Sequence, residues 1–364
     1  MPSFSVQGLD PLQTQLGSAL SGLYQNAQSL LSPARSLNMT QTDSALRSRT
    51  ATTNNSAVLT ATASPDATMK SYQVTVSSLA QAQVNTGTAL NATAASSVSA
   101  GTNTVAVTVN GQTSNVSYGV NAGDTNQTVL NNLASAINNA GLGLQATVLN
   151  DNTAGTVSLQ VSSKVTGTQH GFSLNDVSGN TVAQTGINTV TAAAANASYT
   201  VDGINYTSQG NKVYLDNSKL TLSLWQTSSN PVTVTVNPDT QAITTAATNL
   251  VNQYNNMQRY LNTSGQHIAS TFKGEIGQAV TQAPGLGAIG ITTNGDGTLS
   301  LDQNKLTTAI QTDFASVQQA LGGYNGLGTT LANAAQHVLS SPLANFAAPV
   351  PFVLTQGLFL NTAL

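Results

Sequence analysis

The sequence predicts an α+β multidomain protein in which N- and C-terminal helices pack as coiled-coil-like legs, with β-rich head domains inserted between them. Three observations predict it: apolar residues recur at helical spacing near both ends, short Thr/Val-rich strands fill the middle, and charged residues are scarce. Only 6% of the 364 residues are charged, against about 25% in an average globular protein. Helices with so little charge are expected to bury themselves against each other and against neighbouring subunits. This pattern indicates an assembling structural protein more than an enzyme.

The first predicted element is a helix over residues 9–37. Its apolar residues recur at steps of three and four, which describes a heptad-like stripe. Pro33 is expected to kink or end the helix near its last turn. A single amphipathic helix on a globular core would give the same stripe, but the scarcity of charged flanking residues favours burial on several sides. The stripe consists of Leu9, Leu12, Leu16, Leu20, Leu23, Ala27, Leu30, Ala34 and Leu37.

From about Ser48 onward, apolar and polar residues alternate, which is typical of strands. One amphipathic helix is expected at Thr128–Asn139, and Asp124-Thr125 is the candidate cap at its start. Residues 192–196 are the expected linker between two β-rich lobes. The predicted strands are 50–53, 58–63, 72–76, 105–109, 146–149, 157–161, 199–201, 220–224 and 232–236, with a turn at 54–56.

Helical spacing returns after Asp239. One run has a strict a/d pattern over nearly three heptads, and a second follows a glycine-rich break at 284–290. The first run is Ile243, Ala247, Leu250, Tyr254, Met257 and Leu261; the second is Leu306, Ile310, Phe314, Val317, Leu321, Tyr324, Leu327, Leu331 and Val338.

These elements predict the domain organisation and the residues used for assembly. The predicted sections are an N-terminal leg helix at 1–44, a helical leg or linker domain with a β-hairpin at 45–70 and 239–335, a first β-rich head domain at 71–100 and 192–238, a second head domain inserted in it at 101–191, and an apolar C-terminal tail at 336–364. The residues predicted for leg packing and contacts between subunits are Leu16, Leu20, Leu23, Leu30, Ile243, Leu250, Tyr254, Met257, Leu261, Phe314, Leu321 and Leu331.

The titratable residues do not form a catalytic pattern. His170, His267 and His337 lie in unrelated segments without the spacing of a metal site, and Glu275 is the only glutamate. Residues 294–297 read Asn-Gly-Asp-Gly, which favours a tight hairpin turn because the alternating carboxylates of a calcium loop are missing. We therefore predict no enzyme activity, no catalytic residues, no cofactor and no metal.

The composition excludes further classes. The chain has no cysteine, which suits a protein that crosses between redox compartments, and its net charge of −3 comes without a Lys/Arg cluster. A nucleic-acid partner would require such a cluster. The apolar stretch at 350–364 is interrupted by polar residues and is too short to span a membrane, so no membrane insertion is expected. The N-terminus has no pattern of a Sec signal peptide.

Four blocks of sequence stand out when taken in order along the chain. They are 57–64 with 72–83, 196–203 with 220–222 and 231–236, Leu250-Val251-Asn252-Gln253-Tyr254-Asn255, and Ile289-Gly290-Ile291 followed by Asp296-Gly297-Thr298-Leu299-Ser300-Leu301-Asp302 and Lys305-Leu306. In this order they resemble the FliD family of bacterial flagellar filament cap proteins, also called flagellar hook-associated protein two, and the last block is the most specific. Residues 121–147 also resemble the hook-IN motif of flagellar axial proteins.

The resemblance implies a function. Such proteins form a homo-oligomeric plate at the distal end of the growing filament, and flagellin subunits fold and insert beneath it. It further implies export by the flagellar type III system, an extracellular location at the filament tip, and hook–filament junction proteins and an export chaperone as further partners. In some species the head also binds mucin or host surfaces.

Two alternatives stay open at this point. An extracellular adhesin would also combine a helical stalk with β-rich lobes, but it would require an anchor or a Sec signal. Another flagellar axial protein, either a flagellin or a hook–filament junction subunit, would share the helix–β–helix order. The Asp-Gly-Thr-Leu-Ser-Leu-Asp block and the Val-Asn-Gln-Tyr-Asn block favour the cap.

Overall fold

The structure, a computed structural model, describes residues 11–349 and confirms the α+β multidomain class. The predicted positions Leu9 and 350–364 lie outside the described residues. The chain divides into two compact units. The helical unit contains the described residues up to Thr50, then 64–69 and those from Val236 onward, and the β-rich unit contains 51–63 and 70–235.

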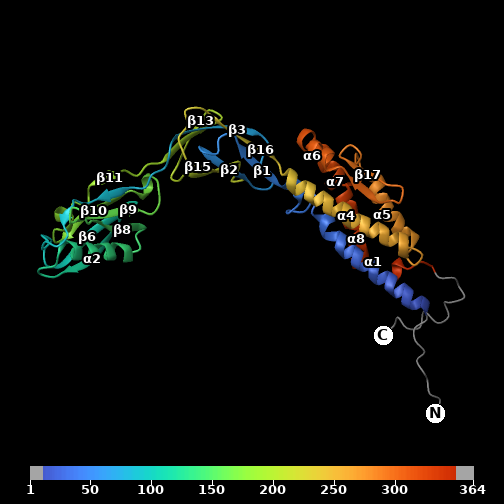
Figure 1. Cartoon of the computed structure of the whole chain (residues 1–364), viewed down its shortest axis with the longest axis horizontal. Helices are drawn as coiled ribbons and strands as arrows, with labels where there is room; N and C mark the ends of the chain where they lie inside the picture. The colour runs from blue at the N-terminus through green and yellow to red at the C-terminus, as the bar shows by residue number, and fades with distance from the viewer. Residues whose placement is uncertain (1–10, 350–364) are drawn as a thin grey trace, which may run out of the picture. The chain divides into compact units, whose positions relative to one another are not determined.

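The helical unit is built from both ends of the chain. Its core helices α1 (Pro11–Arg35), α4 (Thr240–Ser264) and α8 (Leu327–Ser340) lie side by side (Figure 1). Around them lie α5 (Ser270–Gln282), α6 (Gln303–Thr312), α7 (Phe314–Gly322), the hairpin β17 (Ile291–Thr293) and β18 (Leu299–Leu301), and the short turns η1 (Ala45–Arg47) and η3 (Leu343–Phe346). One apolar core joins these elements.

The predicted second helical run is not continuous. Asp313 ends α6 and caps α7, because its carboxylate accepts a hydrogen bond from the Ser316 amide at 3.2 Å. The prediction that Tyr324 lies in the apolar stripe is wrong: this residue lies between α7 and α8, and its side chain is 92% exposed. Glycines on both sides of it favour a turn over a helix.

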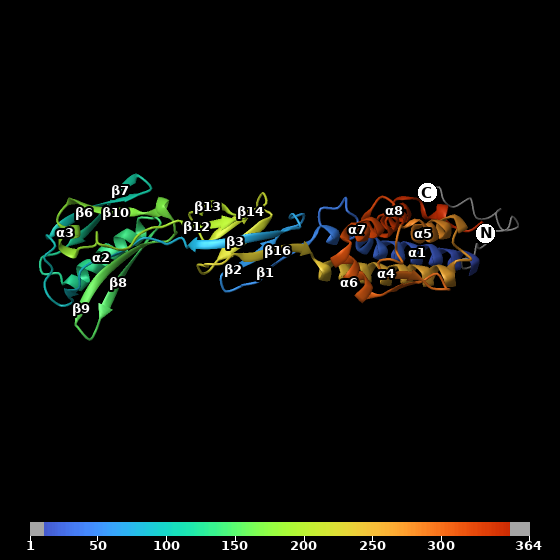
Figure 2. The same cartoon turned by 90° about the horizontal axis from the view of Figure 1, so that it is seen from above.

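The β-rich unit contains a five-stranded sheet in the order β1-β16-β3-β12-β13 and a three-stranded sheet in the order β14-β15-β2. Figure 2 shows β3 between β12 and β16. In both sheets the residues alternate between buried and more exposed positions, so each sheet buries one face. The strands are β1 (Arg49–Thr53), β2 (Leu59–Ala63), β3 (Ser71–Ser78), β12 (Ala197–Val201), β13 (Ile204–Ser208), β14 (Lys212–Leu215), β15 (Leu220–Leu224) and β16 (Val232–Pro238).

A second set of elements is inserted between β3 and β12 and has its own apolar core. The predicted helix is present as α2 (Asn126–Asn139), and the Thr125 hydroxyl caps it by accepting from the Thr128 amide at 3.2 Å. The remaining elements are β4 (Val84–Thr86), β5 (Leu90–Asn91), β6 (Gly101–Val109), β7 (Gln112–Val120), β8 (Leu144–Asp151), β9 (Thr156–Ser163), β10 (Phe172–Ser178), α3 (Thr181–Thr185), β11 (Val190–Ala192) and the turn η2 (Thr168–His170).

The segment at 45–70 differs from the expected grouping with the helices. Its strand β2 pairs with β15, in register from Leu59 opposite Leu224 to Ala63 opposite Leu220, and residues 51–63 belong to the β-rich unit. Only the flanking parts stay with the helices, where the Arg47 guanidinium binds the Asp66 carboxylate. A chain that enters a sheet through alternating Thr and Ala residues cannot be assigned to either unit from its pattern alone.

Candidate assembly site in the helical unit

The residues predicted for assembly converge on the core of the helical unit. Leu16 and Leu20 of α1 are partly exposed, and Leu20 packs against the core. The other ten side chains are buried inside one chain, so their packing within the unit is seen, whereas their use between subunits stays a prediction. The buried ten are Leu23, Leu30, Ile243, Leu250, Tyr254, Met257, Leu261, Phe314, Leu321 and Leu331.

Close contact between α1 and α4 depends on a glycine that the sequence analysis did not single out. The Tyr260 hydroxyl donates a hydrogen bond to the Ala19 carbonyl of α1. A Cβ at position 22 would lie 2.7 Å from that hydroxyl oxygen, so Gly22 is required for the ring to lie against α1. The sequence signal was present as a glycine inside an otherwise regular helical stripe, where glycine costs about 1 kcal/mol relative to alanine.

The two sequence blocks that favour the cap meet in this unit. The Asn255 side-chain amide donates to the Leu299 carbonyl at 2.8 Å, and its oxygen accepts from the Leu299 amide at 2.7 Å. The Tyr254 hydroxyl donates to the Gly297 carbonyl at 2.9 Å. The predicted hairpin turn at 294–297 is confirmed, since β17 and β18 pair in antiparallel register around it. Helix α4 therefore holds this hairpin through side chains as well as by apolar contact.

Asn255 provides the first test of this arrangement. Replacing Asn255 with alanine leaves both backbone groups of the buried Leu299 without their partners, which costs about 1–3 kcal/mol. We expect the urea midpoint of the chain to fall accordingly. Asn252→Ala, on the exposed side of the same helix, is the matched control and should leave the midpoint unchanged. Equal midpoints for the two variants would contradict the role of Asn255.

Tyr254 predicts a dependence of stability on alkaline pH. Burial raises the pKa of its hydroxyl from 10.0 to about 12, so the folded unit holds the phenolic proton more tightly than the unfolded chain does. The raised pKa therefore contributes roughly 2–3 kcal/mol to the free energy of unfolding. This stabilisation is fully present below pH 10 and is lost as the pH rises toward 12. The unfolding free energy of Tyr254→Phe, measured by denaturant titration across this range, should fall less steeply than that of the wild type.

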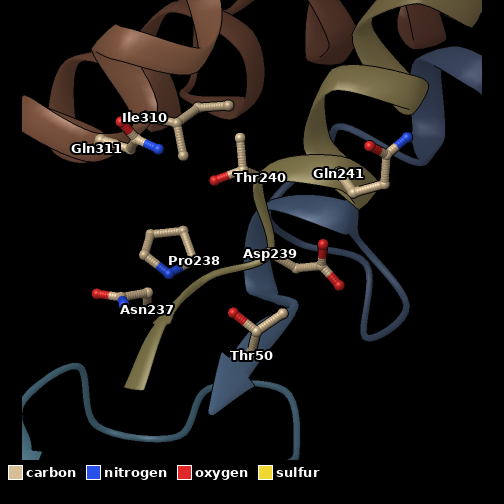
Figure 3. A pocket seen from close by; sticks show the side chains of 8 residues that line it. All are labelled: Thr50, Asn237, Pro238, Asp239, Thr240, Gln241, Ile310 and Gln311. Atoms are coloured by element: carbon tan, nitrogen blue, oxygen red, sulfur yellow. The ribbon is translucent and has the colours of Figure 1, made fainter. Parts of the chain in front are cut away.

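A pocket of about 410 Å³ lies where the chain enters α4. Figure 3 shows Pro238, Thr240 and Ile310 around a common space. The only titratable residue that lines it is Asp239, whose carboxylate accepts from the Ala242 amide at 2.9 Å and so caps α4. The lining therefore provides no acid–base pair. Across residues 11–349, no group of three or more His, Asp or Glu side chains is placed to hold a metal ion.

Comparisons with known proteins agree with this arrangement. The family model for the flagellar hook-associated protein 2 N-terminus matches residues 12–83, and the model for the C-terminus of the same protein matches 194–283 and 266–348. The two models together match more than half of the chain and leave most of the insertion between β3 and β12 unmatched. No helix within the described range is both long enough and apolar enough to cross a membrane.

Two relatives extend the match over most of the chain. The B-type flagellar hook-associated protein 2 of Pseudomonas aeruginosa is 27% identical over 327 residues, which is 78% of this chain and 68% of that protein. The D1-D2-D3 domains of the flagellar cap protein FliD from Escherichia coli superpose with a TM-score of 0.65 at 24% identity, over 90% of this chain and 98% of that one, which shows a shared fold. The chain therefore belongs to the FliD family of flagellar cap proteins, the flagellar hook-associated proteins 2.

Proposed function

We propose that this chain is the structural cap at the distal end of a bacterial flagellar filament, where a homo-oligomer promotes the folding and insertion of exported flagellin. The observation that carries the proposal is that both matched family segments, which lie at opposite ends of the sequence, contribute to the helical unit: α1 comes from the first segment, and α4 to α8 come from the second. A cap subunit with such a unit can contact the filament through helices while its β-rich unit remains a separate body.

The proposal includes the partners and the location. Flagellin is the main partner, the subunits of the plate contact one another, and the protein works outside the cell after export by the flagellar type III system. Hook–filament junction proteins and an export chaperone are the further partners that we propose. The partly exposed residues Leu16 and Leu20 are the best placed of the predicted assembly residues to contact a neighbouring subunit, because the other ten are buried within one chain.

The other functions considered from the sequence receive less support. An adhesin is not favoured, since neither the family matches nor the pocket in Figure 3 provides evidence of a glycan site. A flagellin or a junction subunit is not favoured either, because both family models describe hook-associated protein 2. Enzyme activity has no support from the titratable residues that the structure describes.

Deletion of the coding sequence in the flagellated host tests the proposal. We expect cells without filaments and flagellin in the culture medium, and we expect restored filaments when the full chain is supplied. Electron microscopy of the purified protein should show ring-like plates that bind to filament ends. Filaments of normal length in the deletion strain would overturn the cap assignment.

A further inference from the structure

Strand β13 (Ile204–Ser208) is an unprotected edge of the five-stranded sheet (Figure 1). It pairs with β12 over five consecutive residues without a bulge, and it is the last strand in the order of that sheet. Edge strands are normally blocked by a charge, a proline, a bulge or a covering segment. β13 has no charged residue, no proline and no bulge, and the residues from Ile204 to Thr207 are all exposed.

The buried face of the sheet continues onto this edge. Ile204 and Tyr206 lie opposite Val201 and Tyr199 of β12, which are both buried, and the rings of Tyr199 and Tyr206 stack with centroids 5.7 Å apart. Yet Ile204 is 61% exposed and Tyr206 is 40% exposed. The apolar face of the sheet therefore extends one strand beyond the part that is covered within the chain.

The backbone of β13 also presents a regular row of donors and acceptors. β12 and β13 are joined by the two-residue turn Asp202-Gly203, in which both residues have positive φ, 51° and 83°. In such a hairpin the closing pair, Val201 and Ile204, exchanges both of its hydrogen bonds, and every second pair after it does the same. The N–H and C=O groups of Asn205 and Thr207 consequently point away from β12, toward the open edge.

We propose that β13 pairs antiparallel with β13 of a second copy of this chain, about a two-fold axis through Tyr206. In this register Asn205 lies opposite Thr207 of the second copy and Thr207 opposite its Asn205, so four hydrogen bonds form between the two outward pairs. The two Tyr206 side chains lie side by side, and each Ile204 lies opposite a Ser208, which leaves room for its exposed branched side chain.

Charge also favours a copy of the same strand as the occupant. A symmetric contact brings two copies of every charge on the strand into the same short strand pair, so a charge on β13 would add like-charge repulsion across the contact. β13 carries none, and the charges at its turn already neutralise each other, since Lys70 Nζ lies 3.2 Å from Asp202 Oδ2. The inference does not depend on the cap function, because it follows from this edge alone.

Oxidative cross-linking of the full chain tests the pairing. The sequence has no cysteine, so Tyr206→Cys introduces a single thiol. Directly opposed residues of a non-hydrogen-bonded antiparallel pair have Cα atoms about 4.5 Å apart, within the range for a disulfide. We expect Tyr206→Cys to form a covalent dimer under mild oxidation much faster than Val190→Cys, a control position that is 51% exposed. Equal rates would overturn the proposal.

A second substitution separates pairing from random collision. Thr207→Pro removes an outward N–H that β12 does not use, and by symmetry it removes two of the four intermolecular hydrogen bonds. In the Tyr206→Cys background it should slow cross-linking by about tenfold or more, whereas Thr207→Ala, which keeps the N–H, should not. If the proline variant has a lower melting temperature than its parent, Ile204→Lys is used instead, because this substitution places a charge on the exposed apolar face of β13.

Both outcomes of this comparison are decisive. A Tyr206→Cys parent that forms no dimer would reject self-pairing and would leave the edge to another strand, such as a segment of flagellin. If the proline and alanine variants give the same yield of dimer, the outward N–H and C=O groups of β13 do not contribute to the contact, and self-pairing is rejected as well.

Discussion

Replacing Leu250 with aspartate is expected to unfold the helical unit while the β-rich unit stays folded. Leu250 is fully buried in α4 at the centre of the core that also contains Met257 and Leu331. Losing the leucine side chain costs about 2–5 kcal/mol, and a carboxylate without a partner in the core adds several more. Together these approach the whole stability of an average domain, about 5–15 kcal/mol.

Circular dichroism and limited proteolysis measure this effect. The helical signal should fall, and protease should leave a resistant fragment near residues 51–235, which contains both segments of the β-rich unit. Met257→Asp should behave in the same way, since Met257 is equally buried. Asn249→Asp adds the same charge to the exposed face of α4 and should melt like the wild type. An unchanged melting curve for Leu250→Asp would show that α4 does not contribute to a packed core.

Deletion of residues 1–40 is expected to abolish filament growth while the β-rich unit stays folded. Removing α1 uncovers the faces of α4 and α8 against which Leu23 and Leu30 pack, and it removes the hydroxyl contact from Tyr260 to Ala19. If the helical unit seats the cap, emerging flagellin is then lost to the medium. Filament counts by microscopy and flagellin in the supernatant measure the result.

Two controls accompany the deletion. The amount of the variant itself outside the cell must be measured, because a chain retained in the cytoplasm would fail for a different reason. Lys164→Ala, a substitution in the β-rich unit, should leave growth intact. Normal filaments in the strain that carries the deletion would contradict the role of α1 in seating the cap.

The sequence predicted long, strongly periodic elements well. The a/d pattern from Ile243 to Leu261 corresponds to α4, because a helix buried along one side must repeat its apolar residues at that spacing. Strands with one buried face, such as β15 and β16, were found for the same reason. Tyr324 was misplaced because its spacing fits a helix although the neighbouring glycines form a turn.

Some elements are not revealed by the pattern, among them β7, β10 and α5, although each carries buried apolar side chains. β13 has no alternation, because its side chains are exposed at almost every position, and β14 was missed in the same region. The sequence gives no separate signal for Asn255, since a polar residue beside a helical stripe normally faces water. Its role depends on Leu299, forty-four positions along the chain, and only the fold brings them together.

The pairing of α1 with α8 has a consequence for the order of events during synthesis. Arg35 donates a hydrogen bond to Gln336 at 2.9 Å across 301 positions, so α1 leaves the ribosome long before its partner exists. The β-rich unit, complete once β16 has been made, can fold in the meantime. Until α4 and α8 have been made, the leucines of α1 lack the two helices against which they pack. A newly made chain therefore exposes the apolar residues of α1 to a chaperone, whereas in the folded subunit most of these residues are buried.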